Sequence, residues 1–189
     1  LMQRYRDHTF IKPEFIQNTV ELSSPISHSI AKLDHQVRLL VKDLMANCRD
    51  LGIALVGAGT HPYNRGLAKI TPTPRFLAIE EAEGYNSHTQ ITFATHVHIG
   101  MRSGDEAITV MRGLMRYLPL LIALSANSPY WRGFDTHYDS FRHYVLGAVR
   151  SYGQPPEFKD WQEFSEFYTA VKQVGIFETI NDIHWDIRP

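Results

Sequence analysis

Two histidines separated by one residue, His96 and His98, are the strongest chemical feature of the sequence. They fall in an alternating segment, residues 91–99, that predicts a strand, so both imidazoles would lie on one face. Such a pair could bind a single metal ion or phosphate group. Gly100 follows and leaves room for a substrate to approach closely. The alternative is that the histidines only form hydrogen bonds within a sheet, and the pair by itself favours neither reading.

Carboxylates on a second expected strand are candidate metal ligands. Glu21 shares one face of segment 15–22 with other polar side chains, and Glu14 directly precedes that segment. Mg²⁺ prefers oxygen donors and takes few of them from the protein, so one carboxylate here could bind it. The alternative is that Glu21 is an ordinary solvated strand residue.

The segment from residue 57 to residue 62, GAGTHP, follows a short apolar run at 53–56 that predicts another strand. Small residues at a strand end let a ligand reach the backbone, which makes Thr60 and His61 candidate pocket residues. The segment is not a phosphate-binding loop, because the required lysine and Ser/Thr are missing. A tight structural turn is the alternative.

Arg142 and Arg188 are candidates for binding a carboxylate or a phosphate, which the planar guanidinium suits, although surface arginines are common. No nucleophile motif is present, and the single cysteine, Cys48, falls on the buried face of a predicted helix. Imidazoles, carboxylates and arginines together fit metal-assisted phosphoryl transfer or metal-assisted hydrolysis.

The elements that must position these residues form one expected domain over residues 1–189. Apolar spacing and end signals predict one long helix that Gly52 terminates, one that Ser103 and Glu106 cap and that breaks near Pro119, and one that Gly175 closes. Strands between helices suit either an α/β or an α+β fold. The predicted helices are 29–50, 79–90, 103–125 and 160–174, with a loop at 64–78 and mostly irregular chain at 127–159.

Composition narrows the class of protein further. The formal net charge of −1 gives no electrostatic reason to expect a nucleic-acid partner. The longest apolar run, residues 118–126, is too short to cross a bilayer, so no membrane partner is expected. The first residues lack the apolar core of a signal peptide, and we therefore expect a cytoplasmic protein.

Eight segments, matching in order and spacing over nearly the whole chain, resemble the carboxylate–amine ligases related to type-2 glutamate–cysteine ligases. Each segment is weakly diagnostic by itself, whereas the ordered set is specific. The segments are 19–22 (TVEL), 57–62 (GAGTHP), 96–100 (HVHIG), 104–105 (GD), 116–119 (RYLP), 122–129 (IALSANSP), 133–136 (GFDT) and 185–189 (WDIRP).

This resemblance implies an α+β fold of the glutamine-synthetase type, with a curved antiparallel sheet backed by helices. It implies an ATP- and Mg²⁺-dependent reaction, in which the γ-carboxylate of glutamate is phosphorylated and cysteine or another amine attacks the acyl phosphate. The roles implied are Mg²⁺ binding by His96 and Glu21, ATP phosphate binding by His98 and Arg188, substrate binding by Thr60, His61 and Arg142, and charge stabilisation by Arg142 and Arg188.

Two departures from the family pattern concern the metal site. The resemblance implies an earlier strand with paired metal-binding carboxylates and a later strand after the WDIRP segment, and neither is found in these 189 residues. We therefore expect a fold that is incomplete at both ends and a site that is about half built. The alternatives are an inactive fragment of such an enzyme and a metal-dependent hydrolase that uses His96 and His98. A homodimer is expected by analogy alone.

Overall fold

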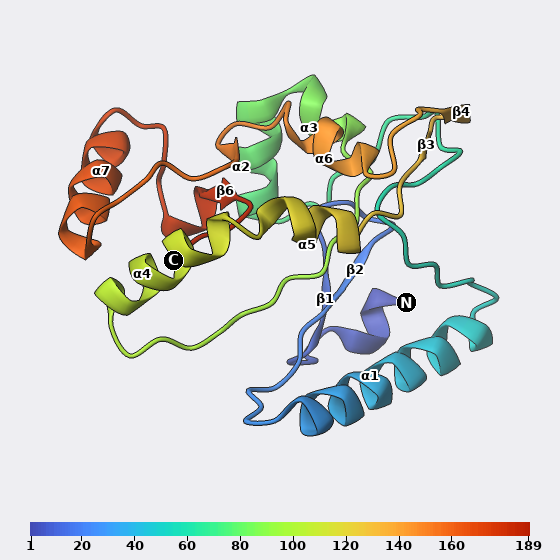
Figure 1. Cartoon of the computed structure of the whole chain (residues 1–189). Helices are drawn as coiled ribbons and strands as arrows, with labels where there is room; N and C mark the ends of the chain where they lie inside the picture. Colours follow the sequence, from blue (N-terminus) through green and yellow to red (C-terminus); the bar gives the residue numbers. More distant parts are fainter. The chain divides into compact units, whose positions relative to one another are not determined.

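Helices carry most of the regular structure, and the strands form three separate two-stranded ladders (Figure 1). The computed structural model describes all 189 residues. It contains two compact units, residues 1–57 with 66–91 and residues 58–65 with 92–189, and each is described by itself. This mixture of elements is compatible with the predicted α+β class. The curved sheet and the single domain over residues 1–189 stay predictions.

The long helix of the first unit, α1 (Ile30–Asp50), confirms its predicted ends. The hydroxyl of Ser29 accepts a hydrogen bond from the Lys32 amide, which satisfies one of the free N–H groups of the first turn. Gly52 follows the helix with a φ of 65°, a conformation that costs glycine little. Both signals act within a few residues, and this is why the sequence places the helix accurately.

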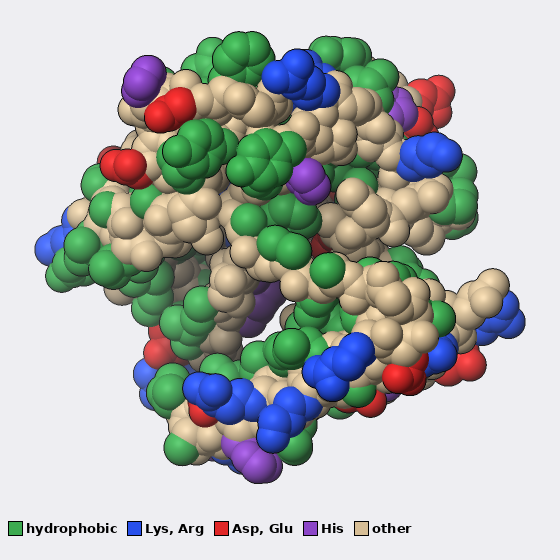
Figure 2. All heavy atoms as spheres, turned by 90° about the vertical axis from the view of Figure 1, so that its right-hand side faces the viewer, with side chains coloured by type: hydrophobic (Ala, Val, Ile, Leu, Met, Phe, Trp, Pro, Cys, Tyr) green, Lys and Arg blue, Asp and Glu red, His purple; other side chains and the backbone are tan.

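The apolar stripe of α1 is buried only in its second half. Leu44 and Cys48 are fully buried against Tyr5 and Ile11, whereas Ile30 is 81% exposed. The predicted structural role of Cys48 is therefore confirmed. Figure 2 shows hydrophobic and basic side chains intermixed over the lower part of the visible face, where α1 lies.

The first residues form η1 (Met2–Tyr5) and the antiparallel pair β1 (Ile11–Pro13) and β2 (Val20–Leu22). The predicted strand 15–22 is therefore wrong except for its last three residues. Its alternating pattern is interrupted by a turn, in which the amide and the hydroxyl of Thr19 both donate to the carbonyl of Ile16, at 3.0 and 2.7 Å.

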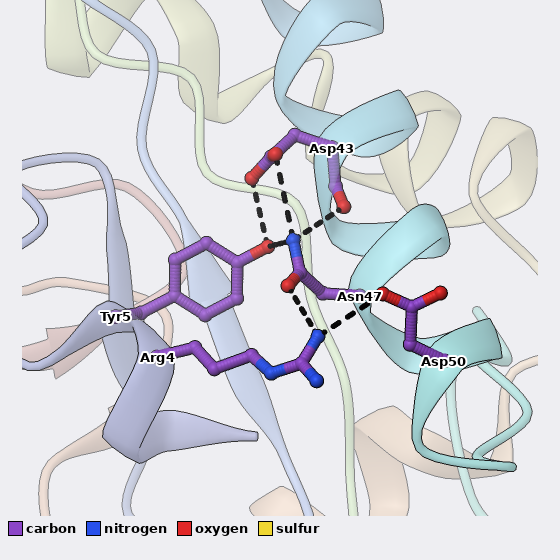
Figure 3. A network of polar contacts seen from close by, with 5 residues as sticks. All are labelled: Arg4, Tyr5, Asp43, Asn47 and Asp50. Atoms are coloured by element: carbon purple, nitrogen blue, oxygen red, sulfur yellow. Dashed lines mark hydrogen bonds and ion pairs between the residues drawn. The ribbon is translucent and has the colours of Figure 1, made fainter.

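A polar network joins η1 to α1 (Figure 3). The hydroxyl of Tyr5 donates to the carboxylate of Asp43 at 2.7 Å and accepts from the side-chain amide of Asn47 at 2.8 Å. The guanidinium of Arg4 donates to Asn47 at 2.8 Å and to Asp50 at 3.3 Å. Tyr5 is buried, so its hydroxyl requires these partners.

The protonation of Tyr5 makes this network sensitive to alkaline pH. Burial, followed by the hydrogen bond to Asp43, raises the pKa of Tyr5 from 10.0 to about 12. The unfolded chain therefore loses this proton first as pH rises, and the stabilisation that is complete below pH 10 is lost between pH 10 and about 12. We expect the free energy of unfolding to fall more steeply over that window in the wild type than in Tyr5→Phe. Equal pH dependence of the two proteins would contradict this assignment.

Two short helices complete the first unit, α2 (Pro74–Glu83) and α3 (Tyr85–Thr89). The predicted helix over 79–90 is confirmed in part, since Gly84, with a φ of 54°, divides it. It also begins five residues earlier than predicted, within the expected loop. The reason is local, because the hydroxyl of Thr73 accepts from the Phe76 amide and Pro74 suits the first helical position.

In the second unit, α4 (Gly104–Met115) and α5 (Leu118–Leu124) meet at 67°, which confirms the break predicted near Pro119. The Ser103 hydroxyl caps α4, but Glu106 accepts from the Arg102 amide and not from that of Ser103, so the predicted capping box is only half formed. No single helix is long and apolar enough to cross a membrane, and only α4 and α5 counted together meet that criterion.

The last helix, α7 (Trp161–Gln173), begins at Asp160 as predicted and packs against α4. At the contact Gly104 is required, because a Cβ there would lie 2.2 Å from the Trp161 ring, and Asp105 accepts from the Trp161 amide at 2.9 Å. The helix ends before Gly175, as predicted, and Val174 next to it is exposed. The buried core of this unit is Ile108, Met111, Phe158, Phe164, Phe177, Ile183 and Trp185.

The strands of the second unit are short. β3 (Tyr130–Trp131) pairs antiparallel with β4 (Phe134–Asp135), and β5 (Tyr152–Gly153) pairs parallel with β6 (His184–Trp185). The other elements are α6 (Phe141–Leu146) and η2 (Ile180–Asp182).

The strands predicted at 53–56 and 91–99 are wrong, because neither segment joins a ladder. Thr92 forms only an isolated bridge with Thr60, and residues 94–100 are exposed outside any ladder, with Val97 82% exposed. An alternating sequence indicates a strand, but a strand also needs a neighbour that supplies its hydrogen bonds.

Candidate functional site

The loop predicted to line a pocket, residues 57–62, is tied into the second unit from Ala58 onward. The Thr60 side chain is buried, and its hydroxyl donates to the carbonyl of Tyr130 at 3.0 Å. The carbonyl of Gly59 accepts from the Phe93 amide at 2.9 Å. Nδ1 of His61 accepts from the Asn64 amide at 3.0 Å. The Thr60 hydroxyl and Nδ1 of His61 therefore form hydrogen bonds that stabilise the loop.

Gly59 lets this loop pack against another. A Cβ at Gly59 would lie 2.5 Å from Oδ1 of Asn127 and 3.0 Å from Cβ of Ser128. The glycine therefore allows the backbone to approach residues 127–128. Two of the matching sequence segments, GAGTHP and IALSANSP, meet at this contact.

Ser128 connects that contact to Arg142. Ser128 is buried, and its hydroxyl accepts from the backbone amide of Arg142 at 3.0 Å. The backbone of Ser128 also donates to the carbonyl of Asp139 at 3.0 Å. These bonds fix the start of α6, and α6 in turn positions Arg142 and His143.

Arg142, His143, Tyr152 and Asp186 form a polar cluster, named here the α6 cluster. Nε2 of His143 lies 3.3 Å from Oδ2 of Asp186, and the rings of His143 and Tyr152 are 5.6 Å apart. The Tyr152 hydroxyl interacts electrostatically with both Asp186 and Arg142. The Asp186 amide donates to the carbonyl of Gly153 at 2.8 Å, so the parallel pair β5–β6 holds Tyr152 and Asp186 together.

The charges of the α6 cluster are partly shielded from water. The side chain of Asp186 is 7% exposed and that of His143 is 37% exposed. Burial raises the pKa of Tyr152, Arg142 opposes that rise, and Asp186 adds to it, so the phenol is neutral at physiological pH. Nε of Arg142 is buried without a hydrogen-bond partner. An unsatisfied guanidinium N–H is what an incoming anion would bind.

Arg188 lies two residues beyond Asp186, and its guanidinium donates to the carbonyl of Ile183. Arg188, the second arginine predicted to act on phosphate, therefore lies in the same segment as Asp186, the carboxylate of the α6 cluster.

The predicted metal ligands lie in different units, Glu21 in the first and His96 in the second. His96 and His98 are both exposed, with ring centroids 6.1 Å apart and ring planes at 66°. Glu21 is exposed in β2 of the first unit, opposite Lys12 in the register, and Glu14 accepts from the amide of Phe15.

Neither unit by itself offers a set of ligands that fits a magnesium ion. No group of three or more His, Cys, Asp or Glu side chains in the 189 residues could hold a metal ion. His96 and His98 offer imidazole nitrogens, whereas Mg²⁺ prefers oxygen. A zinc hydrolase site would need three protein ligands, so the same observation leaves the hydrolase alternative without support.

Sequence reasoning found Arg142 by its residue type but missed Ser128, His143, Tyr152 and Asp186 as site residues. Asp186 lies within the WDIRP segment, and the match of that segment to the family pattern is the sequence feature that could have identified it. His143 and Asp186 are 43 residues apart, and no short spacing rule links them.

The fold is compatible with the α+β class, and the α6 cluster places the buried Nε of Arg142 near Tyr152 and Asp186. The model of glutamate-cysteine ligase family 2 matches residues 3–189. The chain belongs to that family.

Curated relatives agree with this assignment. The chain is 42% identical over 189 residues to the protein named putative glutamate–cysteine ligase 2 of Trichormus variabilis, which covers 100% of this chain and 49% of the relative. It is 35% identical over 180 residues to the protein of the same name from Gloeobacter violaceus, a match that covers 95% of this chain and 48% of the relative. It is 38% identical over 187 residues to the protein named putative glutamate–cysteine ligase 2-1 of Legionella pneumophila strain Corby, a match that covers 98% of this chain and 48% of the relative. The chain spans about half the length of these relatives.

Proposed function

We propose that this chain is part of an ATP-dependent ligase that joins a carboxylate, the γ-carboxylate of glutamate in the first instance, to an amine such as cysteine. The observation that carries this proposal is the family match over residues 3–189. The chemistry of the α6 cluster also supports it, because the buried and unpaired Nε of Arg142 suits a reaction whose reactants and products are anions.

In the proposed reaction a carboxylate oxygen attacks the terminal phosphorus of ATP, and ADP leaves. The amine then attacks the acyl carbon, and phosphate leaves. Arg142 would bind the carboxylate or stabilise charge on the transferring group, a contribution that is large in water-poor sites. Arg188 and His98 are proposed to contact the phosphates, and Thr60 and His61 to shape the substrate pocket.

Further features of the family resemblance belong to the proposal. We include the curved antiparallel sheet, a requirement for Mg²⁺ with ligands at His96 and Glu21, a cytoplasmic location and a homodimer. Because neither unit by itself assembles a magnesium site, no step is assigned to the metal.

The proposal is tested by measuring ADP release from ATP and Mg²⁺ in the presence of L-glutamate and a panel of amines that includes cysteine. We expect release that requires both the carboxylate and the amine, and that falls at least about tenfold in His96→Ala, since a lost phosphate or metal contact costs on the order of 1.4 kcal/mol or more.

The matched control is His35→Ala, which removes an exposed imidazole from α1. We expect its rate to equal that of the wild type. ADP release that ignores glutamate and the amine would overturn the ligase proposal, whereas equal rates in the two histidine variants would remove only the role of His96.

A further inference from the structure

His143 and Asp186 form an imidazole–carboxylate pair in which one partner is covered and the other is accessible. The Asp186 side chain is 7% exposed and that of His143 is 37% exposed. The carboxylate is fixed through its own backbone, whose amide donates to Gly153 in the β5–β6 pair. The imidazole projects from α6, which Ser128 anchors through the Arg142 amide.

This geometry selects one tautomer of His143. With Nε2 at 3.3 Å from Oδ2 of Asp186, the proton belongs on Nε2, and Nδ1 carries the lone pair. No other hydrogen bond engages the imidazole. A carboxylate that holds one nitrogen of a histidine, with the second nitrogen left able to accept a proton, is the arrangement of a general base.

The groups around His143 suit a reaction in which a nucleophile releases a proton close to a bound anion. The charged or titratable groups facing it are Asp186, Tyr152 and the adjacent Arg142. Tyr152 is neutral and interacts with both Asp186 and Arg142. The β5–β6 pair holds the carboxylate of Asp186 in place, and the arginine proposed to bind the anionic reactant is the residue next to the base.

We propose that His143 is the catalytic base of the amine step and that Asp186 is its positioning residue. This rests on the proposed ligase function. As the amine nitrogen bonds to the acyl carbon, the bond from that carbon to the phosphate oxygen breaks and phosphate leaves with the bonding electrons. The proton lost by the nitrogen passes to Nδ1 of His143, and the imidazolium so formed is stabilised by Asp186 and returns its proton to solvent.

The test compares two amine acceptors in His143→Gln. Both acceptors release a proton when the new C–N bond forms. An alkyl amine such as that of cysteine is a strong base that is largely protonated at pH 7, whereas hydroxylamine is a weak base, is largely neutral and depends less on a protein base. We expect the rate with the alkyl amine to fall about 10²–10⁴-fold, as for loss of a general base. We expect hydroxamate formation from hydroxylamine to stay close to the wild-type rate.

Chemical rescue separates catalysis from structure. Added imidazole should restore part of the amine-dependent rate in His143→Ala, because a free base can occupy the vacated space. Asp186→Asn should show the same selective loss for alkyl amines to a smaller degree. The matched control is His137→Asn, which removes another histidine near an aspartate, 3.8 Å away and 89% exposed, at a positive φ that asparagine tolerates.

The outcomes distinguish the two proposals. If the wild type makes neither amide nor hydroxamate, the ligase function fails. The base assignment is overturned if the wild type is active and His143→Gln reacts equally slowly with both acceptors, with no rescue of His143→Ala by imidazole. It is also overturned if His143→Gln reacts with both acceptors at the wild-type rate. In either case the ligase function stands.

Discussion

Arg142→Met should lower the rate of ligation by about 10²–10³-fold, the loss typical when one preorganised donor to a developing anion is removed. The guanidinium lies in the α6 cluster with its Nε buried and unpaired, so the anion it binds would otherwise be poorly stabilised. Methionine keeps the length of the side chain, and the backbone amide that donates to Ser128 is unchanged, so α6 should remain in place. The measurement is kcat/KM for ADP release dependent on glutamate and amine.

Arg38→Met is the control for the loss of a cation. Arg38 is an exposed helix residue paired with Asp34 four positions earlier, and such surface pairs contribute little. Its rate should match the wild type, and Arg142→Lys should recover only part of the activity because lysine lacks the planar fork. A wild-type rate in Arg142→Met would contradict the role given to the α6 cluster.

Phe164→Ala should destabilise the second unit by about 3–5 kcal/mol, the cost of emptying a large buried aromatic site. Phe164 is 2% exposed in α7 and contacts Phe158, Tyr168 and Trp185, with ring centroids 5.4, 6.2 and 6.5 Å away. Trp185 directly precedes Asp186, so the same cavity should loosen the carboxylate that holds His143. The measurement is the denaturant midpoint, followed together with the ligation rate.

Phe134→Ala provides the comparison for this core substitution. Phe134 is exposed in β4, and its ring is 5.6 Å from the guanidinium carbon of Arg65, a contact worth about 0.5–1 kcal/mol at an exposed site. We expect a loss no larger than that. Similar losses in the two variants would show that Phe164 is not in a tightly packed core.

The helices were predictable because their determinants are local. Ser29, Ser103 and Asp160 each cap the helix that follows, and each side chain accepts from an amide three residues later. Proline at position 119 interrupts helical hydrogen bonding whatever surrounds it. Such signals are read within one turn of chain, and the structure confirms them.

The strands were not predictable for the opposite reason. The segment around His96 has an alternating pattern but no neighbouring strand, and Thr19 folds its own segment back onto Ile16 before a ladder can extend. β5 and β6 form from residues 152–153 and 184–185, which have no strand pattern, because the core around Trp185 brings them together. Strand pairing depends on contacts distant in sequence, and single-sequence periodicity does not contain them.

The residues of the candidate site likewise differ in whether local sequence or distant contacts determine their position. Arg142 was identified from the chemistry of its side chain, and Thr60 and His61 from their loop. Tyr152 and Asp186 acquire their roles only when β5 pairs with β6 and places both beside α6. The His143–Asp186 pair is therefore a property of the tertiary structure, although each residue stands plainly in the sequence.

The most direct test of the central claim follows one oxygen atom. With L-glutamate labelled with ¹⁸O in its γ-carboxylate, ATP and an acceptor amine, activation through an acyl phosphate must transfer one labelled oxygen to the phosphate released. We expect ¹⁸O in inorganic phosphate in a one-to-one ratio with the amide formed. Amide formation with unlabelled phosphate would contradict carboxylate activation by phosphoryl transfer and would require a different reaction for this family member.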